Sequence, residues 1–439
     1  MTYLETMQMF ASPQGLRGEI INLAASCGLD RPCFTKMLDY TIKLFETQGL
    51  GKEYYGYHNI THELEVTYVT LIVLKWKSIV NSIKEDDFKY LYAAALFHDF
   101  DPQKSVDKPH EDNVIKFLTS DTSLGQLFKD ANLDINIIMV LILRTTYPWR
   151  GELKEHAEEQ IAKCFDSSPI TKDSPEMRDY YMRLGWLLSV IDRVGGYSLG
   201  DFAKAMDMAK KNAHALAWHP SFIVKRSVAY FEDLLNIESE MCETVLHALP
   251  KDMRKNFMDA VTGFLNLRQQ EIKIHSDYLY ENLRLVPKIE AMRSRLDKDF
   301  QAGLFEIYNE LPTPLQINRE NFIKTVEDTK TILNTLRVGS SDGPIIGYSK
   351  GGPLENYVLR SEIIDGNYGK HNTVFLEPIA LKMGYWGLRG GSEMRHLFTM
   401  QAHSMNYKYL TSFALRDVIQ KRIDVQEKAE FVKIGRAHV

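Results

Sequence analysis

The chain has 439 residues, of which 44% are hydrophobic, 25% charged and 11% aromatic, and its formal net charge is −5. This is the composition of a globular protein, and the acidic balance gives no general attraction to nucleic acid or anionic lipid. The longest apolar runs, at residues 68–74 and 135–143, are far shorter than a bilayer span, and residues 1–14 lack the features of a secretory leader. We therefore expect a cytoplasmic protein with no membrane or nucleic-acid partner.

Helices are predicted throughout residues 16–267, because apolar residues recur three and four positions apart and Gly and Pro are confined to the joints. In residues 86–97 an apolar stripe follows acidic residues, which the helix dipole favours at an N-terminus. This helix brings His98 and Asp99 to its C-terminal end. Further helices are predicted at residues 110–118, 135–144, 177–194, 221–239 and 253–283.

The pattern changes after about Val286, where strands and turns alternate with helices. Strands are predicted at residues 288–293, 332–338, 344–348, 373–381 and 407–414, and helices at residues 299–311 and 392–404. The predicted fold class is therefore multidomain, with an all-α helical bundle followed by an α+β domain that contains a mixed sheet. We expect the bundle in residues 1–240, a helical connector in 241–285 and the α+β domain in 286–439.

Three short segments of the helical half carry imidazole and carboxylate groups. His58 and His62 are four residues apart, a turn of about 400° that places both on one face of a helix. His98 and Asp99 follow, and Asp192 comes later, within an apolar helix where a carboxylate is costly to bury unless it is paired or metal-bound. Such nitrogen and oxygen ligands suit Mn, Fe, Zn or Mg ions.

The order of these residues resembles the HD superfamily of metal-dependent phosphohydrolases over about residues 30–240. Within that superfamily, Tyr-His-Asn-x-x-His followed by His-Asp-x-Asp is most similar to the cyclic-nucleotide phosphodiesterases. The resemblance implies that His58 is the general acid that protonates the leaving oxygen. It also implies that one or two ions bind, with Asp99 bridging if there are two, and that the metal ligands are His62, His98, Asp99 and Asp192.

The chain departs from the phosphodiesterase pattern after Asp101, where Pro102 and Gln103 replace the expected His and Gly. This weighs against a cyclic nucleotide more than against phosphoester hydrolysis. The pair His110-Glu111 resembles a His-Glu found in other HD enzymes, so His110 is a further candidate ligand. A bound divalent ion lowers the pKa of its water to about 7, which activates the water for attack on phosphorus.

Several polar residues near these motifs are interpreted as structural. Asp101 is predicted to end a helix, and Arg193 to pair with an acidic neighbour. Arg144, Thr145 and Thr146 could contact a phosphate, but a solvated helix end is the favoured interpretation.

Residues 371–414, predicted as strand, glycine-rich loop, helix and strand, resemble the acyl-CoA-binding core of the GNAT N-acetyltransferases. In that family the loop N–H groups and the helix N-terminus hold the CoA pyrophosphate. The resemblance implies acetyl-CoA as a cofactor and an amine as acceptor, although Arg389 stands where the middle glycine is expected. Glu377 is either the general base or an edge or surface glutamate. The implied cofactor-binding residues are Gly387, Leu388, Arg389, Gly390, Gly391 and Ser392.

The last residues, 434–439, look like the translation of a sequencing adapter, and we expect the natural protein to continue beyond them through the last GNAT strands. Three functions remain open. The first is a phosphohydrolase acting on a small phosphoester or nucleotide, fused to a GNAT-like domain. The second is an N-acetyltransferase whose HD domain senses a nucleotide without cleaving it. The third is a catalytically silent, metal-stabilised scaffold.

Overall fold

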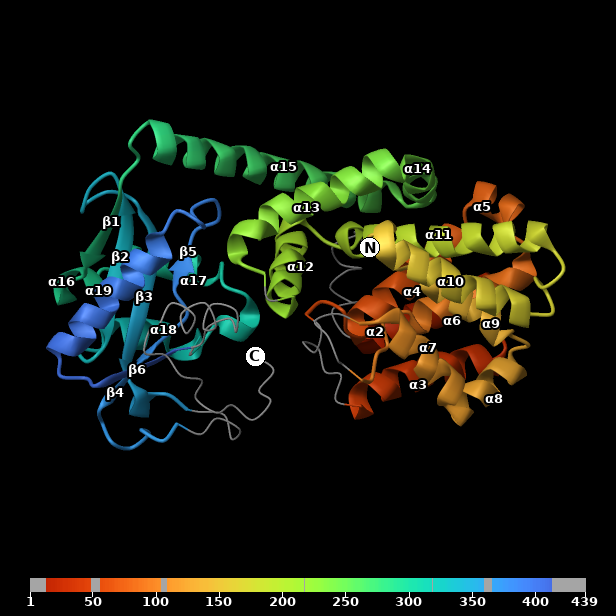
Figure 1. Ribbon diagram of the computed structural model, residues 1–439, viewed down its shortest axis with the longest axis horizontal. Coiled ribbons are helices and arrows are strands. Elements are labelled where there is room, and N and C mark those ends of the chain that lie inside the picture. The colour runs from red at the N-terminus through yellow and green to blue at the C-terminus, as the bar shows by residue number, and fades with distance from the viewer. Residues whose placement is uncertain are drawn as a thin grey trace. The chain divides into compact units, whose positions relative to one another are not determined.

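The computed structural model describes residues 13–48, 56–103, 109–216, 218–317, 319–358 and 365–412. The adapter-like residues 434–439, Lys108 and the predicted strand end at 413–414 lie outside the described residues. The chain divides into two compact units: unit 1 is Met1–Leu216 with Arg226–Phe264, and unit 2 is Ala217–Lys225 with Leu265–Val439. The predicted helical N-terminal region and mixed C-terminal sheet are confirmed (Figure 1).

Unit 1 is helical in its described residues, and the long α15 (Lys251–Tyr280) begins in it and continues into unit 2. The other helices up to that point are α2 (Pro13–Ser26), α3 (Pro32–Thr47), α4 (Ile60–Leu74), α5 (Lys77–Ser82), α6 (Phe88–Phe97), α7 (Glu111–Ser120), α8 (Thr122–Asp130), α9 (Ile135–Leu143), α10 (Gly151–Ser167), α11 (Pro175–Ser198), α12 (Phe202–Ala215), α13 (Ile223–Glu232) and α14 (Ser239–Ala248).

Four of these helices form the centre of unit 1: α4 packs on α6, α6 on α9, α9 on α11, and α11 back on α4. Two of them, α6 and α9, are apolar on nearly every side, as expected for helices inside a bundle. In α9, all residues from Ile137 to Leu143 are buried, and in α6 only Lys89 is not. The side chain of Asn59 caps α4 by accepting hydrogen bonds from the N–H groups of Thr61 and His62. This cap fixes the residue at which α4 begins and therefore places His62 in its first turn.

Unit 2 is built on a sheet with strand order β1-β2-β3-β4-β6, and β5 pairs with β3. The strands are β1 (Leu285–Ile289), β2 (Ile332–Val338), β3 (Ile345–Pro353), β4 (Thr373–Leu376), β5 (Ala380–Leu381) and β6 (Tyr409–Ser412). Neighbours run antiparallel except β4 and β6, which are parallel. The helices of this unit are α16 (Met292–Arg295), α17 (Lys298–Tyr308), α18 (Phe322–Glu327) and α19 (Gly390–Ser404).

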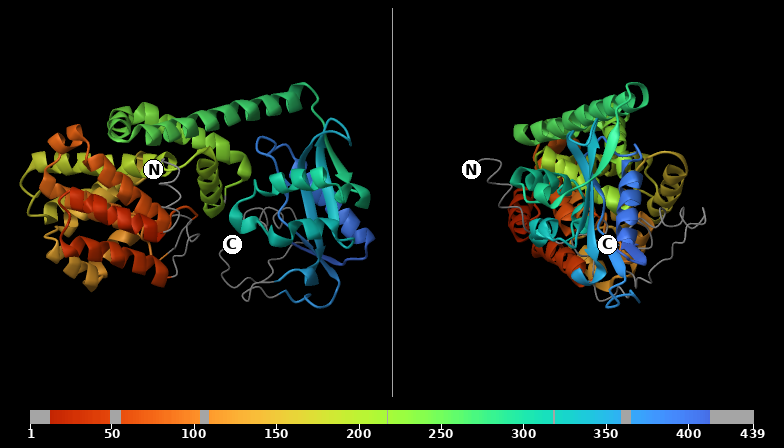
Figure 2. Two further views of the ribbon diagram at one scale, coloured as in Figure 1. Left: turned by 180° about the vertical axis from the view of Figure 1, so that it is seen from behind. Right: turned by 90° about the vertical axis from the view of Figure 1, so that its left-hand side faces the viewer.

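The sheet has α19 on one face and α17 with α18 on the other (Figures 1 and 2). The alternation of side chains along β2 explains this arrangement. Ile332 and Leu336 belong to the clusters that include Phe398 and Met394 of α19, whereas Leu333 packs in the cluster of α17 and α18. Both faces of the strand are therefore covered.

Three predicted strands differ from those observed. The strand expected at residues 344–348 continues to Pro353. The strand expected at residues 288–293 begins earlier and ends at Ile289, and the buried side chain of the next residue, Glu290, bonds Thr335 and Arg337. The strand expected at residues 373–381 is two strands, β4 and β5. Pro378 lies between them, and proline cannot donate a ladder hydrogen bond. No helix in the described part of the chain is long and apolar enough to cross a membrane.

Candidate metal centre

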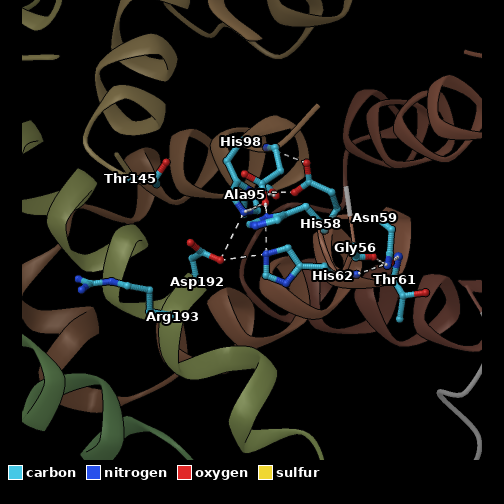
Figure 3. Close-up of polar contacts among 12 residues, drawn as sticks. Gly56, His58, Asn59, Thr61, His62, Ala95, His98, Thr145, Asp192 and Arg193 are labelled. Carbon is cyan, nitrogen blue, oxygen red and sulfur yellow. Dashed lines mark hydrogen bonds and ion pairs between the residues drawn. The ribbon is translucent and has the colours of Figure 1, made fainter. Parts of the chain in front are cut away.

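Side chains from α4, from the end of α6 and from α11 converge inside unit 1 (Figure 3). His62 Nε2 lies 3.0 Å from Asp192 Oδ1 and 3.4 Å from Asp99 Oδ2. His98 Nε2 lies 3.5 Å from Asp99 Oδ2 and 3.6 Å from Asp192 Oδ1. His58 approaches from the residue before the α4 cap, with its Nδ1 2.6 Å from Asp99 Oδ2. All five motif residues thus come together.

The buried nitrogens at this point indicate that a cation fits. His62 Nε2 and His98 Nε2 are buried and have no hydrogen-bond partner, although carboxylate oxygens lie close enough for ion pairs. Leaving buried polar atoms without aligned partners is costly. Imidazole nitrogens and carboxylate oxygens are suitable ligands for a borderline or hard divalent ion. In the described structure they form two groups that share His62, each with its ligand atoms within 4.8 Å of one another: His58, His62 and Asp99, and His62, His98 and Asp192.

Glu63 is a member of the site that the sequence motifs did not predict. Its side chain is fully buried, and its Oε2 lies 2.6 Å from His98 Nδ1, which also contacts the Ala95 carbonyl at 3.0 Å. Its Oε1 accepts the backbone N–H of Asp99 at 2.9 Å. Glu63 therefore holds both residues of the His-Asp pair and leaves His98 Nε2 to face the site. The available signal was a carboxylate directly after His62 at the start of a largely apolar helix.

In the metal-free site, the imidazoles and the carboxylates shift one another's pKa values. Burial opposes protonation of His62, but the carboxylates of Asp192 and Asp99 outweigh it and raise its pKa to about 9. Burial likewise opposes protonation of His98, whose pKa is nevertheless raised, chiefly by Glu63 and Asp99. Burial disfavours ionised Asp99, yet His98 and His58 hold its pKa well below the usual range. An entering cation must therefore displace protons from the imidazoles.

His110 lies outside both groups of side chains that could hold an ion in the described structure. It is the N-cap residue of α7, and its backbone N–H donates to Asp101 Oδ2 at 3.1 Å. The prediction that Asp101 ends a helix is wrong, because α6 ends at Phe97. The buried carboxylate of Asp101 also accepts from the backbone of Gln103 and the side chain of Asn113, so it joins its own segment to the start of α7.

The predicted solvated helix end at Arg144 is wrong, because Arg144, Thr145 and Thr146 are all buried. The turn that follows α9 packs against α11, and the Arg144 guanidinium lies 4.0 Å from the centre of the Trp149 ring. The prediction for Arg193 is confirmed, since it forms an ion pair with Glu238 at 2.6 Å.

In unit 2, Glu377 is buried, so the surface interpretation of this residue is wrong. Its Oε1 accepts hydrogen bonds from Lys350 Nζ and from the Tyr357 hydroxyl, both at 2.9 Å. Lys350 is itself fully buried and donates to Thr325 Oγ1 at 2.6 Å. The carboxylate is therefore neutralised inside the unit, and its role as a general base stays a prediction.

The glycine-rich loop leads directly into the N-terminus of α19. Gly387 has φ of +86°, and Arg389, the N-cap residue, has φ of +63°. This left-handed conformation favours glycine, yet here an arginine adopts it. The carbonyl of Arg389 accepts the N–H groups of Ser392 and Glu393. A loop of this kind before a helix N-terminus has the local geometry that suits phosphate.

Comparison of the chain with protein-family models, with curated proteins and with solved structures finds no match. The functional assignment depends on the site geometry and on the motif resemblances.

Replacing Glu63 with Gln keeps the size of the side chain and removes the charge that faces His98. We expect Glu63→Gln to weaken Mn²⁺ affinity about 10- to 100-fold, as measured by calorimetry on chelator-stripped protein. The matched control is Glu65→Gln, on the same helix and also buried, where the carboxylate instead pairs with Lys204. Equal losses in both variants would contradict a specific role for Glu63.

Metal affinity should depend on pH with a defined sign. Because the His62 pKa is about 9 in the metal-free chain, binding below that pH releases its proton. Affinity should fall about tenfold per pH unit for each displaced proton as pH decreases. Proton release should also appear when Mn²⁺ titrations are repeated in buffers of different ionisation enthalpy. An affinity that does not change between about pH 8 and 6.5 would rule out this charge coupling.

Proposed function

We propose that unit 1 is an HD-type, metal-dependent phosphohydrolase that cleaves a phosphoester, with a cyclic or other nucleotide as its substrate. The observation that carries this proposal is the convergence of His62 Nε2, His98 Nε2 and the carboxylates of Asp99 and Asp192. The residue types and their order along the chain are those that the HD resemblance implies, and the imidazole nitrogens without hydrogen-bond partners support a cation between them.

Each residue has a separate task in the proposed reaction. His62, His98, Asp99 and Asp192 would hold the divalent ion, which, when bound, lowers the pKa of water and neutralises phosphate charge. The 2.6 Å contact between His58 Nδ1 and Asp99 Oδ2 orients the His58 ring. Its other nitrogen, Nε2, would then protonate the leaving oxygen.

Tyrosines beside the centre support a substrate with a flat ring, such as a nucleobase. The centre of the Tyr57 ring lies 4.0 Å from the centre of the His58 ring. Burial raises the pKa of Tyr57, and the negative charges of Asp192 and Asp99 raise it further. Tyr230 contacts the rings of Tyr147 and Tyr197 and donates its hydroxyl to the Arg193 carbonyl. Such ring faces favour stacking with an aromatic group.

For unit 2, we propose a GNAT-like domain that transfers an acetyl group from acetyl-CoA to an amine. This second function is favoured by the parallel pair β4 and β6, with the loop and α19 between them in sequence, and by the left-handed residues at the helix N-terminus. Glu377 is the candidate base. In the alternative, unit 1 senses a nucleotide without hydrolysis and regulates this acetyltransferase.

Hydrolysis of bis(p-nitrophenyl) phosphate with Mn²⁺ tests the first function. Asp99→Ala should abolish the activity. His58→Asn should lower kcat about 10²- to 10⁴-fold for esters with an alkoxide leaving group, and much less for p-nitrophenolate, which needs no proton. The control is His156→Asn, an exposed histidine of α10 that pairs with Asp112. Nucleotide binding without turnover would support the sensing alternative, and metal without binding or turnover a scaffold.

Calorimetric titration with acetyl-CoA tests the second function. Gly387→Val should abolish binding, because a β-branched residue is strained at its positive φ. Gly303→Ala in α17 is the control, since a Cβ there meets nothing within 4 Å. If wild type does not bind acetyl-CoA, or if both variants bind equally well, the loop is not a CoA site.

A further inference from the structure

An open, shallow cavity of about 530 Å³ lies on the surface of unit 1, and it is lined by none of the five residues of the metal motif. Its buried or half-buried lining includes Arg144, Trp149 and Trp186. Three exposed charged residues of α11 also line it: Glu176, Asp179 and Arg183. The volume is in the range that holds a small organic ligand.

Arg144 is the unusual member of this lining. It is only 7% exposed, and its Nη1 has no hydrogen-bond partner. Among the residues that the structure describes, it forms no ion pair. Burial lowers the pKa of its guanidinium to about 10. A buried cation without a hydrogen-bonded counter-ion is costly, so a ligand that supplies one would stabilise this guanidinium.

The nearby carboxylate of Glu238 does not supply that charge. Glu238 accepts from Arg193 Nη2 at 2.6 Å and from Trp186 Nε1 at 2.8 Å. Its charge also acts on Arg144, but the hydrogen bonds go to the other two side chains. The hydrogen bonds of Glu238 therefore leave the Arg144 guanidinium without a hydrogen-bonded carboxylate in the described structure.

The backbone of α11 is adapted to this position of Arg144. A Cβ on Gly185 would lie 2.7 Å from the Cβ of Arg144, a distance that real side chains do not adopt. The absence of a side chain at Gly185 lets Arg144 lie against the helix, with its guanidinium 4.0 Å from the centre of the Trp149 ring.

We infer that Arg144 binds the oxyanion of a small organic ligand whose flat ring lies against the indoles that line the cavity. A guanidinium offers paired N–H donors to a phosphate or carboxylate, and indole faces stack on aromatic rings. The exposed carboxylates of Glu176 and Asp179 disfavour ligands with several negative charges. The ligand class is therefore an aromatic carboxylate or a nucleoside monophosphate, rather than a triphosphate or a polyanion.

The probes are adenosine 5′-monophosphate, benzoate and inorganic phosphate, titrated separately while tryptophan fluorescence is recorded. EDTA is present throughout, so that phosphate cannot bind at the metal centre. We expect saturable binding of at least one of the two aromatic probes, with inorganic phosphate weaker. Binding of the monophosphate alone assigns the site to a phosphate, and binding of benzoate alone to a carboxylate.

Arg144→Gln should weaken this binding at least about tenfold. Arg178→Gln is the matched control, because Arg178 lies on α11, which contributes to the cavity, but pairs with Asp166 and does not line the cavity itself. If Arg144→Gln does not fold, Trp149→Leu keeps the guanidinium, removes its stacking partner and should weaken the aromatic probes. The proposal is overturned if wild type binds none of the probes in EDTA, or if the folded Arg144→Gln or Trp149→Leu variant binds as tightly as wild type.

Discussion

The interior of unit 1 holds imidazole and carboxylate groups that do not satisfy one another. Asp99 and Asp192 lie among apolar helices, where an uncompensated carboxylate is costly. His62 and His98 approach them closely but without hydrogen-bond alignment. Either protons or a cation must balance these charges. The coupled pKa values of the metal-free site describe the first case, and the proposed phosphohydrolase depends on the second.

The fold supplies this arrangement by bringing distant segments together. The cap at Asn59 fixes the start of α4, the end of α6 presents the His-Asp pair, and α11 carries Asp192. Glu63 joins the first two segments, because it is on α4 and holds His98 and the backbone of Asp99. Metal ligands on rigid, packed helices are well positioned before any ion arrives.

In the described structure, both units contain buried polar groups with and without hydrogen-bond partners. In unit 2, Lys350 and Glu377 bond each other and also Thr325 and Tyr357, whereas His275 Nε2 and Asn334 Oδ1 have no hydrogen-bond partner. In unit 1, the buried nitrogens without hydrogen-bond partners include Nε2 of His62 and of His98, and both lie close to carboxylates of the same motif. The proposed chemistry of unit 1 therefore depends on this geometry, and that of unit 2 depends more on its resemblance.

The sequence allowed prediction of features that depend on local patterns. The strand at residues 332–338 and the helix that ends before His98 follow from periodicity, and the metal motif follows from residue type and spacing. Features that arise from packing between helices were not predictable in this way. The burial of Arg144 depends on the close approach that Gly185 permits. The role of Glu63 likewise appears only when α4 and α6 lie together.

The most direct measurement is a crystal structure of the Mn²⁺-loaded protein, with the ion located by its anomalous scattering. The account predicts an ion bound by Nε2 of both His62 and His98 and by carboxylate oxygens of Asp99 and Asp192. A protein that takes up no ion, or an ion bound away from these four side chains, would contradict it.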